Sequence, residues 1–316
     1  MTDEILLGID TSNYTTSVAL VSLDAELVHN GRRLLAVKEG ERGLRQSDAT
    51  FAHIKNLPEL MEMMAEVRAE RKIVAVGVSS RPRNVDGSYM PCFLAGVNAA
   101  VAIAMSSGIP LYTFSHQCGH IEAALFSSCA PVRDKESFAA FHISGGTTEL
   151  LRVRPDDVGF TSELVGGTKD LNAGQVIDRI GVMLGCSFPA GGALDALASE
   201  YKGRIPRKKP SVKGMDVSLS GLENLATKLY FESGDKALTA AFVFDYLGSA
   251  ISEMTRAYIS AYGDTPVVYA GGVMRNSIIR KRLADEFDAY FATPDTSSDN
   301  AVGIASLARR AFLNDK

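Results

Sequence analysis

One short pattern occurs twice in this chain, once near residue 8 and again near residue 142. The first copy reads GIDTSNYTTSVAL and the second reads HISGGTTELLRV. In each copy an apolar run is followed by Thr, Ser or Gly residues and then by a second apolar run, which predicts a strand, a tight turn and a strand. Two such hairpins, each opening a mixed α/β half, favour a duplicated fold with a cleft between the halves over two unrelated α/β domains.

The length of the chain agrees with a duplicated fold. Its 316 residues are too many for one ordinary domain, and they suit two lobes of about 150 residues each. We expect an N-terminal lobe over 1–130 and a C-terminal lobe over 131–316. The last predicted helix, Ala301–Phe312, is able to pack back on the first lobe.

Composition and charge exclude several classes of protein. The net charge of −4 and the pI of about 5.8 do not indicate a strongly basic nucleic-acid-binding protein, although a local basic patch is compatible with them. The four cysteines show no CxxC spacing and suit a reducing compartment. The most apolar stretch, Phe93–Met105, is too short to span a bilayer, and the N-terminus lacks the features of a signal peptide. We therefore expect a cytoplasmic protein with no membrane partner.

Hydrophobic periodicity predicts the main elements of both halves. Strands are expected at Glu4–Asp10, Thr15–Val21, Ile73–Ser79, Pro110–Phe114, Ser137–Ile143, Thr148–Val153 and Pro266–Ala270. Helices are expected at Ala49–Arg71, Phe93–Ser107, His116–Leu125, Asn172–Leu184, Ala190–Glu200, Leu238–Ala261, Ile278–Phe287 and Ala301–Phe312. The face of the first helix that we expect to be buried carries Phe51, Ile54, Leu57, Leu60, Met64 and Val67.

A histidine pair lies at the predicted start of a helix, as His116-Gln117-Cys118-Gly119-His120. The HxxxH spacing places the two imidazoles one turn apart on the same helix face, where they can share a metal ion if a third ligand is available. Two surface histidines are the more frequent explanation of this spacing alone. Gln117 stands where a zincin-type protease has its glutamate, which argues against a peptidase. Asp299 precedes the last helix, where a carboxylate is commonly only a cap.

Three glycine pairs lie at strand ends or helix starts: Gly145–Gly146, Gly191–Gly192 and Gly271–Gly272. Glycine lets backbone N–H groups approach a phosphate closely, and a helix N-terminus favours an anion. Because three pairs occur, the sequence indicates a nucleotide site, although the Walker and Rossmann glycine patterns are both absent.

Two further polar residues have both a structural and a functional interpretation. Asp178 can pair with Arg179 or with a neighbouring turn, or it can contact a ligand. Asn276 follows the third glycine pair and can hydrogen-bond an adenine or a ribose, although Asn is also common in turns.

A basic run interleaved with prolines lies between two predicted helices. Its cations are Arg204, Arg207, Lys208, Lys209 and Lys213. Such a run can contact RNA phosphates, but a solvated loop is the more frequent explanation.

Seven motifs occur in the order found in the tRNA threonylcarbamoyladenosine synthases, metalloproteins formerly described as glycoproteases or O-sialoglycoprotein endopeptidases. They are the pair His116 and His120, Ser144–Gly146, a helix with Asp178, Pro189 before Gly191–Gly192, Ser218–Leu222, Ala270–Asn276 and Ser298–Asn300. Through these residues, which extend over nearly the whole chain, the sequence resembles that family.

The resemblance implies a fold and a set of site residues. The fold is the two-lobed, actin-like ATPase (ASKHA) fold of sugar kinases, Hsp70 and actin, an α/β architecture with duplicated subdomains. A divalent metal, iron or zinc, is expected on His116, His120 and Asp299. The expected nucleotide site includes His142, Ile143, Ser144, Gly145, Gly146, Asp178, Gly191, Gly192 and Asn276.

The resemblance also implies an activity, the metal-dependent transfer of a threonylcarbamoyl or carbamoyl group from an acyl-adenylate. A Lewis acid on the carbonyl oxygen and backbone amides on the departing AMP are physically suited to that transfer. The expected acceptor is the adenosine beside the anticodon of tRNA. The adenylate is made from ATP by a partner enzyme, and an actin-like protein is a further expected partner. No catalytic side chain is assigned.

The chain departs from the family pattern on the expected acceptor side. Ser12–Thr16 lacks the acidic pair of the family's first turn, Thr147 replaces a histidine, and Gln175 replaces a glutamate. These differences indicate a divergent paralogue. A carbamoyltransferase with an acceptor other than tRNA and an ATP-binding scaffold for a full-length homologue are therefore alternatives. A kinase or ATPase of the same fold is a third, although Asp10 is the only acid close to the first turn.

Overall fold

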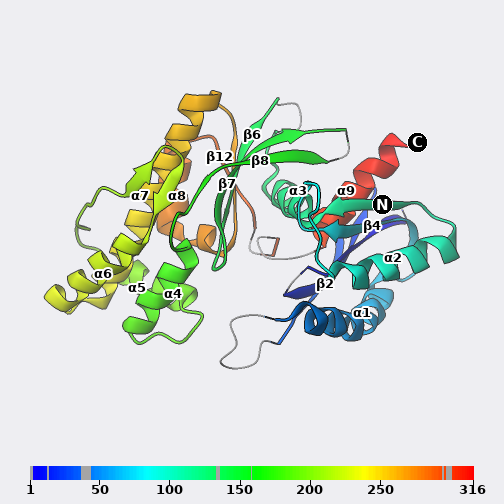
Figure 1. The fold of residues 1–316 in the computed structure, drawn as a ribbon, viewed down its shortest axis with the longest axis horizontal. Coiled ribbons are helices and arrows are strands. Elements are labelled where there is room, and N and C mark those ends of the chain that lie inside the picture. Colours follow the sequence, from blue (N-terminus) through cyan, green and yellow to red (C-terminus); the bar gives the residue numbers. More distant parts are fainter. Residues whose placement is uncertain are drawn as a thin grey trace. The chain divides into compact units, whose positions relative to one another are not determined.

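The computed structural model describes residues 3–12, 14–36, 44–132, 136–157, 159–293, 295–296 and 301–316. The chain divides into two compact units that are interleaved in sequence (Figure 1). Unit 1 comprises Met1–Ser127, Pro155–Thr161 and Asp295–Lys316, and unit 2 comprises Ser128–Arg154 and Ser162–Pro294. The C-terminal helix is thus part of the same unit as the N-terminal strands.

Unit 1 is built on a five-stranded sheet in the order β3-β2-β1-β4-β5. Its strands are β1 (Glu4–Asp10), β2 (Thr15–Ser22), β3 (Leu27–Leu34), β4 (Lys72–Arg81) and β5 (Leu111–Ser115). β2 pairs antiparallel with both β1 and β3, whereas β4 pairs in parallel with both β1 and β5. Because β1, β4 and β5 run in parallel, the residues that follow them meet at one edge of the sheet.

Helices cover both faces of this sheet, and the alternation along β1 shows which helix covers which face. The helices of unit 1 are α1 (Gln46–Arg68), α2 (Phe93–Ser107), α3 (His116–Ser128) and α9 (Val302–Asn314). Ile5, Leu7 and Ile9 pack against α1 and α2. Gly8 points to the opposite face, where a Cβ would lie 2.5 Å from the carbonyl oxygen of Ala301, so its lack of a side chain lets α9 lie directly on the sheet.

The buried face predicted for α1 is wrong in part. The residues of α1 that are buried are Ala49, His53, Leu57, Leu60 and Met64. The side chains of Phe51, Ile54 and Val67, which we expected on that face, are exposed. The apolar residues of α1 surround more than half of the helix, so their spacing alone does not select one face. The face that packs on the sheet is the one carrying small Ala49 and polar His53.

Unit 2 is built on a second five-stranded sheet, in the order β12-β11-β6-β7-β8. Its strands are β6 (Phe138–Ile143), β7 (Thr148–Pro155), β8 (Phe160–Gly167), β11 (Val267–Ala270) and β12 (Ala289–Phe291). β6 pairs antiparallel with β7 and parallel with β11, and β11 pairs parallel with β12. Read from its other end, this order repeats that of unit 1, with β6 in the place of β1. The duplication predicted from the two hairpins is therefore confirmed.

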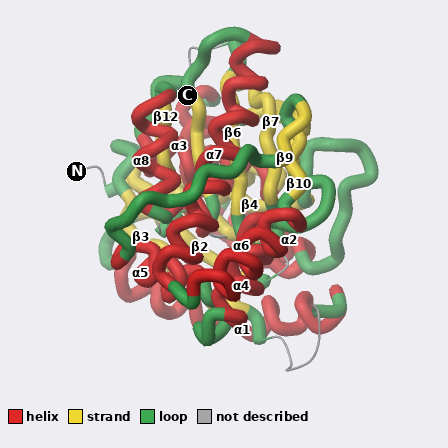
Figure 2. The backbone as a smooth tube through the Cα atoms, turned by 90° about the vertical axis from the view of Figure 1, so that its left-hand side faces the viewer, coloured by secondary structure: helices red, strands yellow, loops and turns green. Residues whose placement is uncertain are grey.

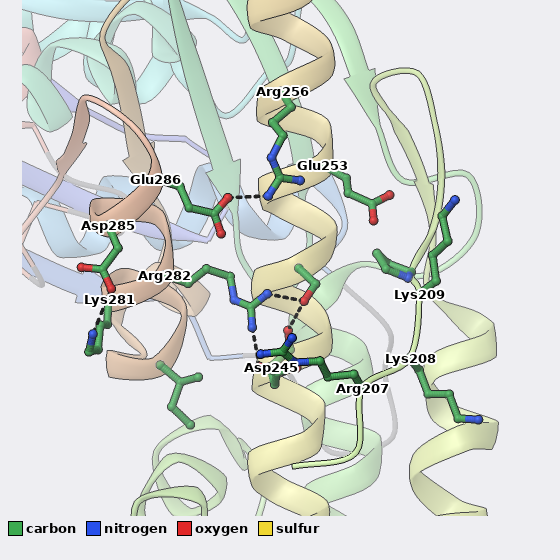
Figure 3. Close-up of a pocket in the computed structure, with 13 residues that line it drawn as sticks. Arg207, Lys208, Lys209, Asp245, Glu253, Arg256, Lys281, Arg282, Asp285 and Glu286 are labelled. Carbon is green, nitrogen blue, oxygen red and sulfur yellow. Dashed lines mark hydrogen bonds and ion pairs between the residues drawn. The ribbon is translucent and has the colours of Figure 1, made fainter. Parts of the chain in front are cut away.

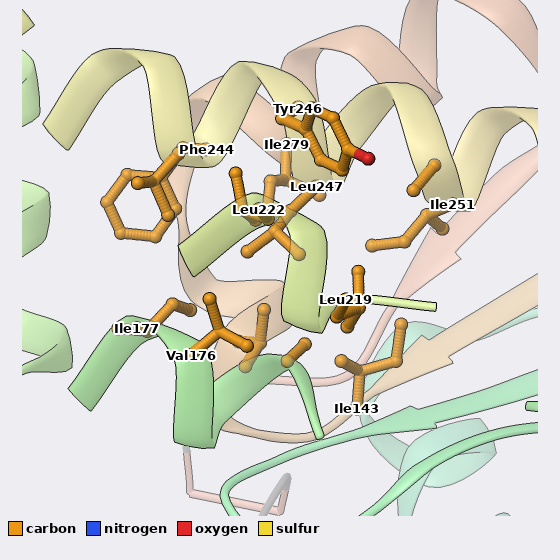
Figure 4. Packing of buried hydrophobic residues seen from close by; sticks show 14 of the residues in the cluster. Ile143, Val176, Ile177, Leu219, Leu222, Phe244, Tyr246, Leu247, Ile251 and Ile279 are labelled. Carbon is orange, nitrogen blue, oxygen red and sulfur yellow. The ribbon is translucent and has the colours of Figure 1, made fainter. Parts of the chain in front are cut away.

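The helices of unit 2 gather around one long, buried helix (Figures 1 and 2). They are α4 (Ala173–Met183), α5 (Gly191–Glu200), α6 (Ser220–Ser233), the long α7 (Lys236–Tyr262) and α8 (Ser277–Glu286). Figure 4 shows how Leu247 of α7 meets Val176 of α4, Leu222 of α6 and Ile279 of α8 in one apolar cluster. Each such side chain, when fully buried, stabilises the fold by about 1.5–3 kcal/mol.

Several elements of unit 2 were not predicted. They are β8, β12, the helix α6 and the small antiparallel ladder of β9 (Ser211–Lys213) and β10 (Asp216–Ser218). In the part of the chain that is described, no helix is both long enough and apolar enough to cross a membrane.

Candidate metal and nucleotide sites

His116 and His120 occupy the first two turns of α3, which follows β5 without a break. Their ring centroids lie 4.2 Å apart and their planes meet at 72°, so the imidazoles are in edge-to-face contact. The ring of Phe93 lies against His116, with a centroid distance of 6.2 Å. The structure thus places the two histidines side by side, as the HxxxH spacing implies.

A buried carboxylate, Asp10, contacts the first of these histidines. Asp10 ends β1 and is 1% exposed. One of its oxygens accepts a hydrogen bond from the backbone N–H of Ser12 at 2.8 Å, and the other lies 2.7 Å from His116 Nδ1. Burial opposes ionisation of Asp10, but the charge and hydrogen bond of His116, together with those from Ser12, outweigh burial and lower the pKa of the carboxyl.

Asp10 was not among the residues that we expected to contact the histidines. The signal was present in the topology, because β1 and β5 both run in parallel with β4. A residue that ends β1 and a residue that follows β5 must therefore lie at the same sheet edge. Sequence spacing could not show it, since the two residues are 106 positions apart.

Asp299, the third expected metal ligand, lies outside the described residues. Within the described ranges, no group of three His, Cys, Asp or Glu side chains is arranged to hold a metal ion. The ligand set of His116, His120 and Asp299 therefore stays a prediction.

The turn between β1 and β2 is held by buried hydroxyl groups. Thr11 Oγ1 donates to the carbonyl oxygen of Cys92 at 3.1 Å. Thr16 Oγ1 lies 2.8 Å from His53 Nδ1 and accepts from Asn56 Nδ2 at 3.2 Å. Burial lowers the pKa of His53 to about 4, so the folded protein keeps this imidazole neutral at pH 7. Where the related family has an acidic pair, this chain has a network of neutral groups.

In unit 2, the turn between β6 and β7 presents bare backbone. Ser144 N–H donates to the carbonyl oxygen of Thr147 at 2.8 Å and closes the turn. A Cβ on Gly145 or Gly146 would meet nothing within 4 Å, so the space around both glycines is open. A Cβ on Gly174, in the first turn of α4, would lie 2.5 Å from Gly145 Cα. The open turn and a helix N-terminus are therefore in contact, an arrangement that suits an anion.

Asp178 supports the second glycine pair. Its Oδ1 accepts a hydrogen bond from the backbone N–H of Ala190 at 2.8 Å, directly before Gly191 begins α5. Arg179 pairs with Glu223 at 3.0 Å, so the salt bridge between Asp178 and Arg179 that we considered is replaced by the contact with a neighbouring turn. A Cβ on Gly192 would meet nothing within 4 Å, so the start of α5 is also open.

Asn276 is buried and caps α8, where its Oδ1 accepts from the backbone N–H of Ile279 at 3.0 Å. Its side-chain amide also donates to Asp195 Oδ1 in α5. Burial raises the pKa of Asp195, although the hydrogen bond from Asn276 acts in the opposite direction. Asp195 was not predicted, and the one available signal was its place one turn after the second glycine pair. Through this bond, the segment after the third glycine pair is fixed to the helix that begins at the second.

The motif Ser218–Leu222 begins α6 through a carboxylate far away in sequence. Asp170 accepts hydrogen bonds from Leu219 N–H at 2.7 Å, from Ser220 N–H at 3.2 Å and from Ser220 Oγ at 2.6 Å. Burial opposes the charge of Asp170, but these bonds and one from Leu171 N–H lower the pKa of the carboxyl to about 2. An ionised Asp170 therefore replaces the local N-cap that α6 lacks.

A cavity of about 310 Å³ opens beside the turn of Gly146. The turn forms one part of its wall, and the remaining wall is mostly polar side chains and the backbone of Gly166–Gly167. Thr148 Oγ1, at one side of this cavity, accepts from the first amide of α4 at 2.9 Å. The residues predicted to form the nucleotide site in unit 2 thus present open backbone at Gly146 and Gly192, and Asp178 and Asn276 hydrogen-bond to the starts of α5 and α8.

Two mixed sheets of equal topology define the class of two-lobed, actin-like folds, and similar solved structures support this fold. HypF from T. kodakarensis is similar with a TM-score of 0.60 and 14% identity over 98% of this chain and 48% of that chain. A ROK family glucokinase from Streptomyces griseus, in complex with glucose and AMPPNP, is similar with a TM-score of 0.55 and 10% identity over 97% and 99% of the two chains. The predicted fold class is confirmed.

Sequence comparison identifies the family within that class. The model of the family "TsaD: tRNA N6-adenosine threonylcarbamoyltransferase" matches residues 35–306. A tRNA N6-adenosine threonylcarbamoyltransferase of Streptococcus suis is 32% identical over 98% of this chain and 92% of its own length. One of Thermus thermophilus is 31% identical over 96% and 92%. The chain belongs to this family of transferases, as its seven motifs predicted.

Proposed function

We propose that this chain transfers a threonylcarbamoyl group from an acyl-adenylate to the adenosine beside the anticodon of tRNA. The observation that carries the proposal is the family match, which extends over residues 35–306 and includes His116, His120, Asp299 and all the residues assigned to the nucleotide. In this reaction the adenosine N6 amine attacks the carbamoyl carbon, a C–N bond forms, the bond from that carbon to the phosphate oxygen breaks, and AMP and a proton leave.

The open glycine turns are suited to hold the AMP part of the adenylate. We assign its phosphate to the amides of Gly145 and Gly146 and to the start of α5 at Gly191 and Gly192, because no side chain fills the space in front of three of these four residues. We assign its nucleoside to Asn276, with His142, Ile143, Ser144 and Asp178 as further contacts. Phosphate-binding amides stabilise AMP as a leaving group because they act on the charge that it gains.

The donor set at the start of α3 fits a divalent cation. His116 and His120 lie side by side, and Asp299 is the proposed third ligand. The Asp10 carboxylate lies 2.7 Å from His116 Nδ1 and is therefore placed to accept from Nδ1–H when a metal occupies Nε2, and a carboxylate in this position raises the basicity of a ligand. When bound, the cation supplies a Lewis acid that polarises the carbonyl oxygen.

The transfer is tested with purified protein, tRNA and enzymatically made threonylcarbamoyl-adenylate, followed by mass analysis of the digested nucleosides. We expect wild-type protein to form threonylcarbamoyladenosine, and His116→Ala to lose at least about 100-fold in rate, since a metal ligand is removed. A matched control is His29→Ala, which removes a histidine on β3. Absence of the modified nucleoside with wild-type protein, at metal occupancy near one, would contradict the proposal.

A second acceptor is favoured by one observation. The turn after β1 carries the hydrogen-bond network of Thr16, His53 and Asn56 in place of the family's acidic pair. If that pair serves the tRNA acceptor, this chain transfers a carbamoyl group to another amine or hydroxyl. The same assay separates the two functions, because adenylate consumption without modified tRNA indicates a different acceptor. For both functions we propose a cytoplasmic location and an actin-like protein partner.

A further inference from the structure

A charged groove of about 760 Å³ lies in unit 2 (Figure 3), and the described residues that line it include none of the site residues assigned above. One wall is the basic segment Arg207–Pro210, and the other is α8. The floor is a face of α7 that carries Asp245, Ser249 and Glu253 at intervals of four residues. Nothing in the proposed transfer uses this groove.

The basic segment is fixed at both ends, although it forms neither helix nor strand before β9. Tyr201 OH donates to the carbonyl oxygen of Arg204 at 3.2 Å, and Ser211 N–H donates to Tyr246 OH in α7 at 3.1 Å. Ile205 and Val212 pack on the apolar core of unit 2. Proline at 206 and 210 restricts φ in between. The cations between these anchors are therefore held at the groove in a preorganised segment.

The positive charge of this segment is not neutralised within the groove. The opposite side is balanced, because Arg282 pairs with Asp245, Arg256 pairs with Glu286 and Lys281 pairs with Asp285. No ion pair or hydrogen bond of the Arg207, Lys208 or Lys209 side chains occurs among the described residues. One lining carboxylate, Glu253, is likewise outside these pairs, so three cations face one acid.

The chemistry of the lining selects the class of ligand. Among the described residues that line the groove, only Pro210 and Ile278 lack a polar side chain, and none is aromatic. A protein partner usually needs an apolar centre in its interface, and a nucleic-acid base usually stacks on an aromatic ring. A row of cations above a polar floor suits phosphates of a nucleic-acid backbone instead.

We propose that the groove between Arg207–Pro210 and α8 binds the sugar–phosphate backbone of the RNA acceptor, with Arg207, Lys208 and Lys209 as its phosphate contacts. This inference rests on the proposed function for the identity of the RNA, but not for the presence of the site. The contacts are to phosphates, so they position the RNA without reading its sequence.

The test compares tRNA binding of two triple variants over a range of salt concentrations, by filter binding with full-length protein. The first variant is Arg207→Gln/Lys208→Gln/Lys209→Gln. The control, Lys55→Gln/Lys72→Gln/Lys228→Gln, removes the same charge from exposed positions outside the groove. We expect the groove variant to bind about 10–100-fold more weakly at low salt, with a plot of log K against log[salt] that is shallower by about 2–3. We expect the control to bind as wild type does.

Four other outcomes would overturn the assignment of RNA to this groove. If both variants weaken equally, the effect is one of net charge, and the groove assignment is overturned. It is also overturned if neither variant differs from wild type, if wild type binds no tRNA, or if polyglutamate of equal charge competes as well as RNA. Thermal unfolding of both variants confirms that they are folded. Groove-dependent binding by a wild-type protein that forms no modified nucleoside would refute the proposed function and leave the groove standing.

Discussion

The equivalent turns of the two sheets offer a direct comparison. Around the turn between β1 and β2, in unit 1, the chain places Asp10, Thr11 and Thr16, and all three side chains are buried and hydrogen-bonded. After β6, in unit 2, it places Gly145 and Gly146, whose backbone faces open space. The strand order around both turns is the same. The two units thus share a strand order, but the turn of unit 1 carries hydrogen-bonded side chains and the turn of unit 2 presents backbone amides without side chains.

The helices that carry the candidate site residues also differ between the two units. In unit 1, α3 presents two imidazoles and a contact to a buried acid. In unit 2, α4 and α5 present their N-termini, and the acid Asp178 serves to fix α5. From this we infer that unit 1 supplies cation chemistry and unit 2 supplies anion binding.

The largest expected difference between the two units is in their response to acid. The pKa of His53 is about 4 in the folded protein and 6.5 by its ordinary value. The unfolded chain therefore takes up a proton below pH 6.5 that the folded unit 1 cannot accept until about pH 4. The free energy of unfolding should fall by about 3 kcal/mol across that window. Chemical denaturation of wild type and His53→Gln from pH 7 to 4 measures the loss, and an equal slope in both would refute it.

Unit 2 should respond at lower pH. The pKa of Asp170 is about 2 in the folded protein and 3.8 by its ordinary value. Its stabilisation of α6 is therefore complete above about pH 4 and is lost as the pH falls toward 2. Amide hydrogen exchange of α6, compared between wild type and Asp170→Asn, follows the loss. If the signal of unit 2 changed together with that of unit 1 between pH 6.5 and 4, the two units would not be independent in this respect.

Gly303 in unit 1 is closely packed, whereas Gly192 in unit 2 faces open space, so an alanine substitution should affect them differently. A Cβ on Gly303 would lie 1.9 Å from the carbonyl oxygen of Gly119, whereas a Cβ on Gly192 would meet nothing within 4 Å. Gly303→Ala should destabilise the protein by about 1–3 kcal/mol because α9 must move away from α3. Gly192→Ala should be neutral or stabilise by up to about 1 kcal/mol. Equal melting temperatures for the two variants would show that α9 does not depend on this close approach.

Removing the Asp178 carboxylate is expected to have a small effect on stability. Asp178→Ala leaves the N–H of Ala190 without its acceptor, which should cost about 1 kcal/mol. Asp178→Asn keeps an acceptor oxygen and should melt as wild type does. Calorimetric titration with AMP then separates the two interpretations of this residue. If Asp178→Asn is stable but binds AMP at least tenfold more weakly, Asp178 contacts the ligand in addition to supporting α5.

The sequence predicts the helices and strands whose ends are marked by neighbouring residues. It misses those whose ends are stabilised by residues far away in the sequence. Phe93–Ser107 was predicted at both ends, since Gly108 stops that helix in the left-handed conformation, with φ 63°. The helix α6 was missed because it has no side-chain cap of its own, and Asp170 supplies the hydrogen bonds from 50 positions away. The same limit applies to the site. His116 and His120 are neighbours by helical spacing, whereas Asp10 reaches His116 only through the parallel sheet.

We inferred that unit 1 binds the cation and unit 2 binds the anion. Two single variants, each measured for both ligands, test this most directly. Asp10→Asn removes the charge that orients His116, and Gly146→Val fills the space before the open amides without meeting any protein atom within 4 Å at its Cβ. For each variant we would measure metal per chain by elemental analysis and AMP affinity by calorimetry. The account predicts that Asp10→Asn loses about 10–100-fold in metal affinity with AMP affinity unchanged, and that Gly146→Val keeps its metal and loses AMP binding. Loss of both ligands in either variant, or normal AMP binding by Gly146→Val, would contradict it.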